Sequence, residues 1–478
     1  MIFEIFRFIN LSYCLYLSNK VHIILYIKIM TTDYSYKTDL FEERKWQGEF
    51  FLPDQFEQRF WGEIEYSPEH GVIFTYSIIG SETPPETAIV HGILNTGERC
   101  SLIGRFRPVM AGIRLHHGQS TRFGKSGFKL LLIGFFVEEN EKFQELSFSL
   151  MPMQEFFFPN GRKDLEKYTD TPLVSIDTSY GKLEIGNNAK FAHLYSADIT
   201  TQIYSPNKKA LEELKVAFNH ISEKYENAHF MLKHDIAYGI TLKINDGAGI
   251  LDAYNHISDI ANLFALLIYS PVYPDSIHII KKYDELPYQI SIRVYPSMVI
   301  DKKTIEICKA ELSHYNLPIR RSNIDLSSLI DTWLEAPTDY ATIITSLQHE
   351  TGYRTEHSAH GELVLYTTQF EYISHKEGKK DKKYEYPLAN YASDKLRNII
   401  TKIFNDVGET DIGIGISNLR NEIAHIGRPV NLLLSLSLKE LIAISRIMQL
   451  TIIGYILENI GISKNLVSSY QDTNFNYA

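Results

Sequence analysis

The spacing of apolar residues changes once along the chain, near residue 316, and this change constrains the fold more than any other feature. Before it, short aromatic and β-branched runs are separated by turn residues, which indicates strands. After it, apolar residues recur every three or four positions, which indicates amphipathic helices. A chain of 478 residues also exceeds what one compact domain usually needs. We therefore predict an α+β protein, with a β-rich N-terminal domain over residues 30–315 and an all-α bundle over residues 316–478.

The N-terminal half carries hairpin signals. Residues 63–66 alternate between glutamate and apolar side chains, and after a turn at Ser67-Pro-Glu-His-Gly71 the chain returns through residues 72–79. A second hairpin is predicted from residues 88–94 and 99–103. The aromatic content of 12% favours this large antiparallel component. Further strands are predicted at 130–137, 183–203, 237–243, 276–280 and 289–294, and helices at 209–225 and 251–269.

The C-terminal part has clear helix signals. Ser393 is a predicted N-cap for an apolar face over residues 396–407. Ser437 and Glu440 form a capping box that opens a long apolar helix ending near Ile460. Residues 447–457 carry no charge, so this helix is either the bundle centre or a subunit interface, and we predict that it is too short to span a bilayer. Further helices are predicted at 326–348, 362–375 and 416–426.

The first 29 residues are apolar enough to suggest a leader or a membrane anchor. The longest charge-free run, residues 8–19, is shorter than the roughly 18 to 20 apolar residues that a spanning helix needs. No small-residue cleavage site follows a clean apolar core. Met30 begins a polar stretch typical of the start of a soluble protein. We therefore expect translation to start at Met30, with membrane attachment as the alternative.

The charge and cysteine content limit the classes of function. The formal net charge is −10, which argues against a broad nucleic-acid-binding surface but leaves room for a small basic site. Cys14, Cys100 and Cys308 are far apart, so a disulfide framework or a thiolate zinc site is not indicated. We expect a protein of the reducing cytoplasm.

Three motifs favour ordinary structural interpretations. Residues 118–126 resemble a phosphate-binding loop, but five residues separate the glycines instead of four and a strand-like run follows. His116 and His117 have no nearby Cys, Asp or Glu at ligand spacing. Arg354 and His360 lie in a glycine-bounded stretch without an apolar helix face, which we predict to be a loop.

The segment Arg420-Asn-Glu-Ile-Ala-His425 is the best candidate for a catalytic site. Arginine has a fixed fork of donors that matches the non-bridging oxygens of a phosphodiester. A neutral histidine can take the proton of a 2′-hydroxyl, and a protonated one can return a proton to the leaving oxygen. Asn421 and His425 share a helix face, whereas Arg420 lies about 140° away and must bend toward a shared pocket or reach one between subunits. The residue types suit phosphodiester cleavage with neither a metal nor another cofactor.

A lysine-rich stretch lies between two predicted helices, at residues 376–383. A solvated loop is the ordinary interpretation. The stretch becomes relevant to function if it borders a phosphate-handling site. Its candidate RNA-contacting residues are Lys379, Lys380, Lys382 and Lys383.

The helical part, with Arg-Asn-x-x-x-His before a long apolar helix, resembles a HEPN ribonuclease domain. Residues 45–53, 61–66 and 88–92 resemble the N-terminal domain of ApeA-type antiphage defence proteins. The resemblance implies a metal-independent endoribonuclease in which Arg420 and His425 are catalytic and Asn421 assists. It also implies a homodimer that forms a shared cleft through its HEPN domains, an RNA substrate, and a phage-derived trigger at the N-terminal domain. Glu371 matches an acidic position on an earlier HEPN helix, where it would orient the arginine or the histidine, although a simple solvated glutamate fits as well.

Two other classes of function remain open at this point. The chain could be a non-catalytic HEPN module that senses a ligand through its N-terminal domain. It could also be a membrane-tethered binding protein, an interpretation that depends wholly on the first 29 residues. Retention of both Arg420 and His425 favours the ribonuclease, because a degenerate module has no chemical need for them.

Overall fold

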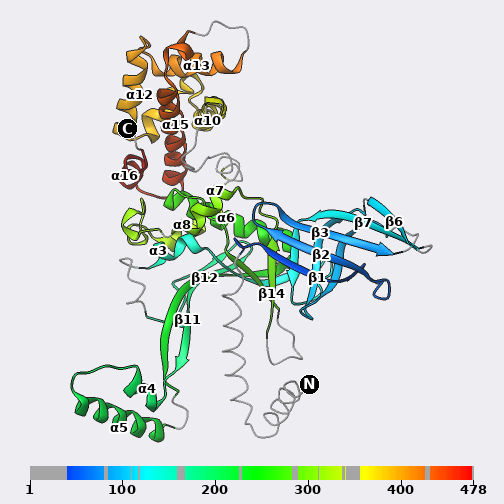
Figure 1. The fold of residues 1–478 in the computed structure, drawn as a ribbon. Helices are drawn as coiled ribbons and strands as arrows, with labels where there is room; N and C mark the ends of the chain where they lie inside the picture. Colours follow the sequence, from blue (N-terminus) through cyan, green and yellow to red (C-terminus); the bar gives the residue numbers. More distant parts are fainter. Residues whose placement is uncertain are drawn as a thin grey trace.

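A computed structural model describes residues 40–79, 84–108, 110–116, 119–158, 167–225, 229–281, 289–310, 312–335, 340, 356–425 and 431–475. The fold is α+β, as predicted, with a large antiparallel sheet in the N-terminal half and a helical C-terminal region (Figure 1). The expectations for the first 29 residues and for Cys14 lie outside the described residues.

Within the described residues, 14 strands form one antiparallel sheet. In the order in which they pair, the strands are β10 (Val174–Thr178), β11 (Gly181–His193), β12 (Met231–Ala248), β9 (Phe143–Ser149), β13 (Ser276–Lys281), β14 (Ile290–Pro296), β8 (Leu130–Ile133), β5 (Arg99–Phe106), β4 (Thr87–Leu94), β1 (Arg44–Phe51), β2 (Phe60–Ser67), β3 (Gly71–Ile79), β7 (Gln119–Phe128) and β6 (Met110–His116). Both predicted hairpins are confirmed, β2 with β3 and β4 with β5. The strand predicted at residues 130–137 stops at Ile133, because Gly134 adopts a φ of 128° that extended backbone does not allow.

The sheet curls around an aromatic core. Phe106 of β5 stacks on Phe128 of β7 at a centroid distance of 6.2 Å, although four strands lie between β5 and β7 in the pairing order. Phe74 of β3 packs against Phe50 of β1 at 4.5 Å. Gly62 of β2 makes this contact possible, because a Cβ there would lie 2.3 Å from the Phe74 ring. The many Phe and Tyr residues of the sequence therefore serve to fill this curled sheet.

The longest hairpin of the sheet, β11 with β12, projects away from the body as an arm (Figure 1). Its tip carries α4 (Ser196–Thr201) and α5 (Lys208–Lys224), and no side chain of α5 is buried. The expected strand at residues 183–203 is therefore wrong beyond His193. The Tyr195 amide donates to the Asp198 carboxylate at 2.6 Å, a capping interaction that starts a helix there.

Helices occupy the C-terminal part and its junction with the sheet. They are α3 (Gln154–Phe157), α6 (Ile250–Ile268), α7 (Lys302–Lys309), α8 (Leu326–Leu334), α10 (Glu356–Lys376), α11 (Glu385–Tyr391), α12 (Asp394–Asp406), α13 (Ile412–Ala424), α14 (Leu432–Ser435), α15 (Leu438–Asn459) and α16 (Lys464–Asn474). The predicted caps at Ser393 and at Ser437 with Glu440 are confirmed. Three helix boundaries differ from the expected ones: α8 ends at Leu334, α10 begins at Glu356, and α13 covers residues 412–424.

The helix α15 is the centre of the bundle. Fifteen of its 22 residues are buried, and α10, α11, α12 and α16 pack around it (Figure 1). Our length argument against a membrane span was wrong, since α15 is long and apolar enough to cross a bilayer, and it is the one such helix among the described residues. Burial accounts for its composition, because 83% of its most apolar window lies inside the protein.

The start of α10 corrects the loop predicted around His360. Ala359, Leu363, Tyr366 and Phe370 are all buried on one face, so the apolar stripe begins one turn earlier than the sequence indicated. His360 is therefore helical, while Arg354 lies outside the described residues.

A buried glutamine joins three helices of the bundle. The Gln471 side chain of α16 donates to the carbonyls of Tyr391 and Leu450 at 2.7 and 2.9 Å and accepts from the Ser393 amide at 2.7 Å. It is fully buried, and Gly454 of α15 leaves the space for it, because a Cβ at position 454 would lie 2.4 Å from the amide nitrogen of Gln471. The close approach of α15 and α16 therefore requires a glycine there.

The sheet and the bundle meet at α6 and α8. The Tyr470 hydroxyl of α16 donates to the carbonyl of Leu266 in α6 at 2.6 Å, and the Tyr269 hydroxyl donates to Gln449 of α15 at 3.2 Å. The Trp333 indole of α8 donates to the carbonyl of Asp259 at 2.9 Å. Buried polar contacts thus fix the bundle against the N-terminal part.

Candidate functional site

The helix α13 positions the predicted Arg-Asn-x-x-x-His motif. Asp411 caps its start by accepting from the Ile414 amide at 2.9 Å, and the buried Leu419 holds it against the bundle. The helix ends at Ala424, so His425 is its C-cap, with φ −121° and ψ 102°. Gly427 and Pro429 follow closely and do not favour continuation of the helix. We expected Asn421 and His425 to share a helix face. Because the helix ends at Ala424, His425 lies one residue beyond that face.

Arg420 is half-buried, and its guanidinium donates to the Asn421 side-chain oxygen at 3.2 Å. A surface salt bridge with Glu422 or Asp406 would be an ordinary structural role for this arginine, but within the described part of the chain Arg420 forms no ion pair. The exposed His425 ring likewise has no hydrogen bond to any described residue. Both side chains are therefore available to an external ligand.

Glu371 of α10 lies close enough to Arg420 for their charges to interact. Its carboxylate accepts from the Tyr384 hydroxyl and, at 3.0 Å, from Lys383. Burial alone would raise the pKa of Glu371, but the hydrogen bonds from Tyr384 and Lys383 and the positive charges of Lys383 and Arg420 together hold this pKa below its usual value. The structure thus brings Glu371, Lys383 and Arg420 together from three different segments.

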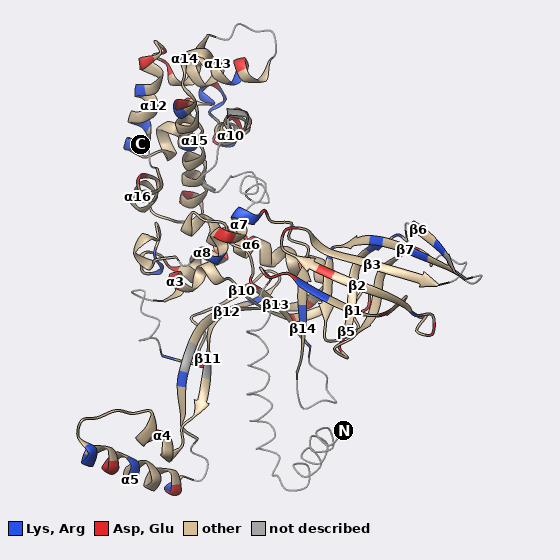
Figure 2. Cartoon of the chain, in the orientation of Figure 1, with Lys and Arg blue, Asp and Glu red and all other residues tan. Residues whose placement is uncertain are grey.

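The lysine-rich stretch forms an exposed turn between α10 and α11, near α13 (Figure 2). Lys383 is tied to Glu371, and Lys382 lies 3.7 Å from Glu385. Among the described residues, Lys379 and Lys380 have no ion-pair partner. The turn is a solvated loop, as its composition indicates, but through Lys383 it also borders the neighbourhood of Arg420.

The sequence did not reveal the contact that Glu422 makes. Its carboxylate accepts from the amides of Leu432 and Leu433, at 3.2 and 2.8 Å, and thereby caps the start of α14. This contact fixes where the chain returns after His425. Glu422 itself, an acidic residue inside the motif, was the one signal of this contact in the sequence. Its partner is a backbone segment, which sequence periodicity does not identify.

The described residues contain no group of three His, Cys, Asp or Glu side chains able to hold a metal ion. Cys100 and Cys308 are both buried, and burial raises the pKa of both thiols, to about 12 for Cys308. Neither is therefore a nucleophile at neutral pH. Residues 119–126 of the glycine-rich motif lie in strand β7 and make no phosphate-binding loop.

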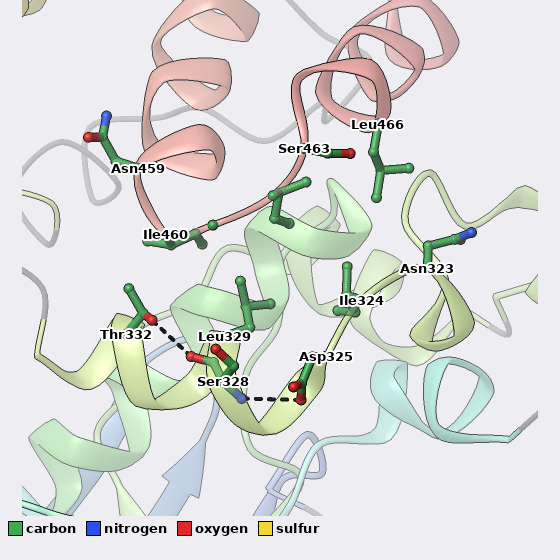
Figure 3. A pocket seen from close by; sticks show the side chains of 12 residues that line it. Asn323, Ile324, Asp325, Ser328, Leu329, Thr332, Asn459, Ile460, Ser463 and Leu466 are labelled. Carbon is green, nitrogen blue, oxygen red and sulfur yellow. Dashed lines mark hydrogen bonds between the residues drawn. The ribbon is translucent and has the colours of Figure 1, made fainter.

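Two cavities lie away from the motif, and neither is lined by Arg420 or His425. One, of about 640 Å³, lies between β4, β5 and the start of α6. The other, of about 300 Å³, lies between α8 and the turn that joins α15 to α16 (Figure 3). The shared pocket toward which we expected Arg420 to bend is thus not one of these two cavities.

A family model described as ApeA N-terminal domain 1 matches residues 45–333. This match covers more than half of the chain and includes the curled sheet, the arm, α6 and α8. It does not extend to the helices that carry Arg420 and Glu371. Searches of curated proteins and of solved structures gave no match.

Proposed function

The chain belongs to the ApeA family of antiphage proteins, and on this premise we propose that its helical part is a HEPN-type endoribonuclease that cleaves RNA without a metal ion. The family match supports the role in defence. The ribonuclease activity is supported by the residues brought together around α13.

The proposed reaction is a transesterification. The 2′-hydroxyl of the RNA loses its proton to neutral His425 and attacks the adjacent phosphorus, and the bond from phosphorus to the 5′-oxygen breaks. Protonated His425 returns the proton to the leaving 5′-oxygen. Arg420 donates to the non-bridging oxygens, where negative charge accumulates in the transition state. The products are a 2′,3′-cyclic phosphate and a 5′-hydroxyl.

Glu371 and Asn421 are positioning residues in this proposal. The negative charge of Glu371 lies near Arg420, and the Asn421 side chain accepts a hydrogen bond from the guanidinium. Together they restrict the directions in which Arg420 can point. The exposed Lys379, Lys380, Lys382 and Lys383 would contact the RNA backbone beside the cleaved bond.

We extend the proposal to the assembly. Two helical bundles would meet so that their α13 helices share one cleft, and a phage-derived trigger would act at the N-terminal domain. The protein would act in the cytoplasm. Because His425 has no ring partner among the described residues, a second copy has room to supply one.

The observation that carries the proposal is the set of charges around Arg420. A half-buried arginine without an ion-pair partner among the described residues lies near the Glu371 carboxylate, whose pKa is depressed and which pairs with Lys383 at 3.0 Å. A structural salt bridge would pair Arg420 directly. This arrangement instead leaves its donors for a phosphate.

The test compares RNA from cells that express the wild type, His425→Ala or Arg420→Ala. We expect cleavage with 2′,3′-cyclic phosphate ends in the wild type and at least a hundredfold less in both variants, the lower end of what a general acid–base group contributes. Controls are His70→Ala and Arg105→Ala, exposed residues of the N-terminal part that should cleave like the wild type. Wild-type cleavage by His425→Ala contradicts the assignment. RNA binding without any cleavage by the wild type indicates the non-catalytic module.

A further inference from the structure

The tip of the arm exposes many large apolar side chains. Nearly half of the exposed large apolar side chains in the described part of the chain lie between residues 191 and 231, in the outer arm and its tip. The arm holds this tip away from the curled sheet and from the bundle (Figure 1). Exposed apolar surface that gathers in one place marks an interaction site in soluble proteins.

The helix α5 at this tip has two apolar sides. One side packs on the arm, where Leu211 and Phe218 are half-buried and the Phe218 ring lies 5.1 Å from that of Phe230. A second stripe lies about 80° round the helix and is exposed along its whole length. It consists of Ala210, Leu214, Ala217 and Ile221. Steps of four, three and four residues are the spacing of a seam between two helices.

The second stripe is complementary to itself when a copy of it is reversed. Small and large side chains alternate along it, so an antiparallel copy places Ala210 opposite Ile221 of the partner subunit and Leu214 opposite the partner's Ala217. A two-fold axis repeats both contacts. With an alanine opposite each large side chain, the two helices can approach to about 8 Å. A parallel copy in register would place alanine on alanine and leave gaps.

The charges beside the stripe fit the same arrangement. Glu213 and His220 lie on one flank of it, both are exposed, and neither has an ion-pair partner among the described residues. In the antiparallel pair, Glu213 lies within about 3 Å, measured along the helix axis, of the partner's His220. A protonated histidine attracts that carboxylate, and the opposed dipoles of the two helices also attract each other.

We propose that the arm tip is a contact between two copies of this chain, in which their α5 helices pair antiparallel along the stripe. The seam spans about 17 Å of helix and buries less than the roughly 1,200 Å² of a standard interface, so the pairing is weak and reversible. The tip and α13 lie at opposite ends of the molecule (Figure 1). The contact therefore uses no residue of the proposed ribonuclease site and does not depend on RNA cleavage.

The experiment joins two copies of the full chain through an engineered cysteine. Ala217→Cys places a thiol beside the two-fold axis, and a short bismaleimide should convert this variant into a covalent dimer at micromolar concentration. Every variant also carries Cys14→Ser, and the natural thiols of Cys100 and Cys308 are buried. Val216→Cys is the matched control, because position 216 is 67% exposed on the same helix but points about 100° away. Its yield of dimer should be at least about tenfold lower, since the pair does not hold its thiols at a high effective concentration.

Substitutions added to Ala217→Cys test the stripe and its charges. Leu214→Glu places a carboxylate in the apolar seam and should lower the yield of dimer at least about tenfold, whereas Val216→Glu, outside the stripe, should leave the yield unchanged. Glu213→Lys and His220→Glu should each lower the yield about two- to fivefold. A mixture of these two chains should recover it, because each chain then meets the opposite charge on its partner.

Three results overturn the proposal: Ala217→Cys gives no dimer, Val216→Cys gives as much dimer as Ala217→Cys, or Leu214→Glu leaves the yield unchanged. Far-UV circular dichroism shows whether Leu214→Glu folds. If it does not, the mixture of charge variants decides, because positions 213 and 220 are both exposed. A mixture that gives no more dimer than its separate components also overturns the proposal.

Discussion

Two helices of this protein, α15 and α5, obtain their stability in opposite ways. Fifteen of the 22 residues of α15 are buried, whereas α5, at the tip of the arm, buries none of its 17. Burying one large apolar side chain is worth about 1.5 to 3 kcal/mol, so packing decides whether α15 is helical. In α5 the caps and intrinsic propensity matter more, with Asn207 accepting from two amides at its start. The difference predicts that substitutions in the bundle change the free energy of unfolding more than substitutions at the tip of the arm.

The largest expected effect on stability is that of Gln471→Leu in the bundle. The change leaves the buried Ser393 amide and Tyr391 carbonyl without their partner, at about 1 to 3 kcal/mol for each group. We expect a loss of about 3 kcal/mol in the free energy of unfolding, measured by urea titration with far-UV circular dichroism. Gln202→Leu, the same change at an exposed residue of the arm tip, should stay within about 0.5 kcal/mol of the wild type. Equal losses in the two variants would contradict the comparison.

A second pair of variants separates packing from helix propensity. Gly454→Ala introduces a Cβ that would lie 2.4 Å from the Gln471 amide, whereas a Cβ at Gly361 of α10 meets nothing within 4 Å. Overpacking costs about 1 to 3 kcal/mol and exceeds the gain of about 1 kcal/mol from replacing a helical glycine. We therefore expect Gly454→Ala to lower the unfolding free energy and Gly361→Ala to raise it. Two shifts of the same sign would show that packing does not control α15.

The bundle and the arm should depend on pH in the same way in their contribution to folding stability. The pKa of Glu371 in the bundle is lowered, and hydrogen bonds from Lys182 and Lys243 lower the pKa of Glu184 in the arm. A depressed carboxylate pKa stabilises the fold above the unfolded value of about 4.3, and this stabilisation is lost as the pH falls through the folded value. Glu371→Gln and Glu184→Gln should therefore lower stability at neutral pH, each by less than about 1 kcal/mol. The difference from the wild type should shrink below about pH 4 in denaturation series, and a constant difference would argue against both ion pairs.

The smallest effect should come from α5. Val216 is 67% exposed, so Val216→Ser removes almost no buried area and should change the unfolding free energy by less than about 0.5 kcal/mol. Val467→Ser is the matched change in α16, where the valine is 1% exposed, and should cost about 2 kcal/mol. A destabilised Val216→Ser variant would mean that the tip is packed against something.

The same contrast explains which features were predictable. Caps at Ser393 and Ser437 and the turn between β2 and β3 depend on a few adjacent residues, so the sequence predicted them correctly. The start of α10 was missed because the burial of Ala359 depends on tertiary context. The helix α4 was missed because its cap from Asp198 is one local contact within a strand-like stretch.

The candidate site divides in the same way. The motif itself was visible, and α13 carries Arg420 and Asn421 and presents His425 at its end. The association of Glu371 with Tyr384 and Lys383 depends on how α10 and the turn before α11 pack. The capping of α14 by Glu422 likewise joins segments that only the folded bundle brings together. Local periodicity does not contain such long-range partners.

The arm tip has a consequence for evolution. Because exposed positions of α5 contribute little to folding stability, selection for a stable fold does not restrict which residues occupy them. A lineage could therefore replace the surface at the tip of the arm many times while the curled sheet and the bundle stay unchanged. By contrast, positions 471 and 454 cannot change independently, because the Gln471 side chain occupies the space that a Cβ at position 454 would need.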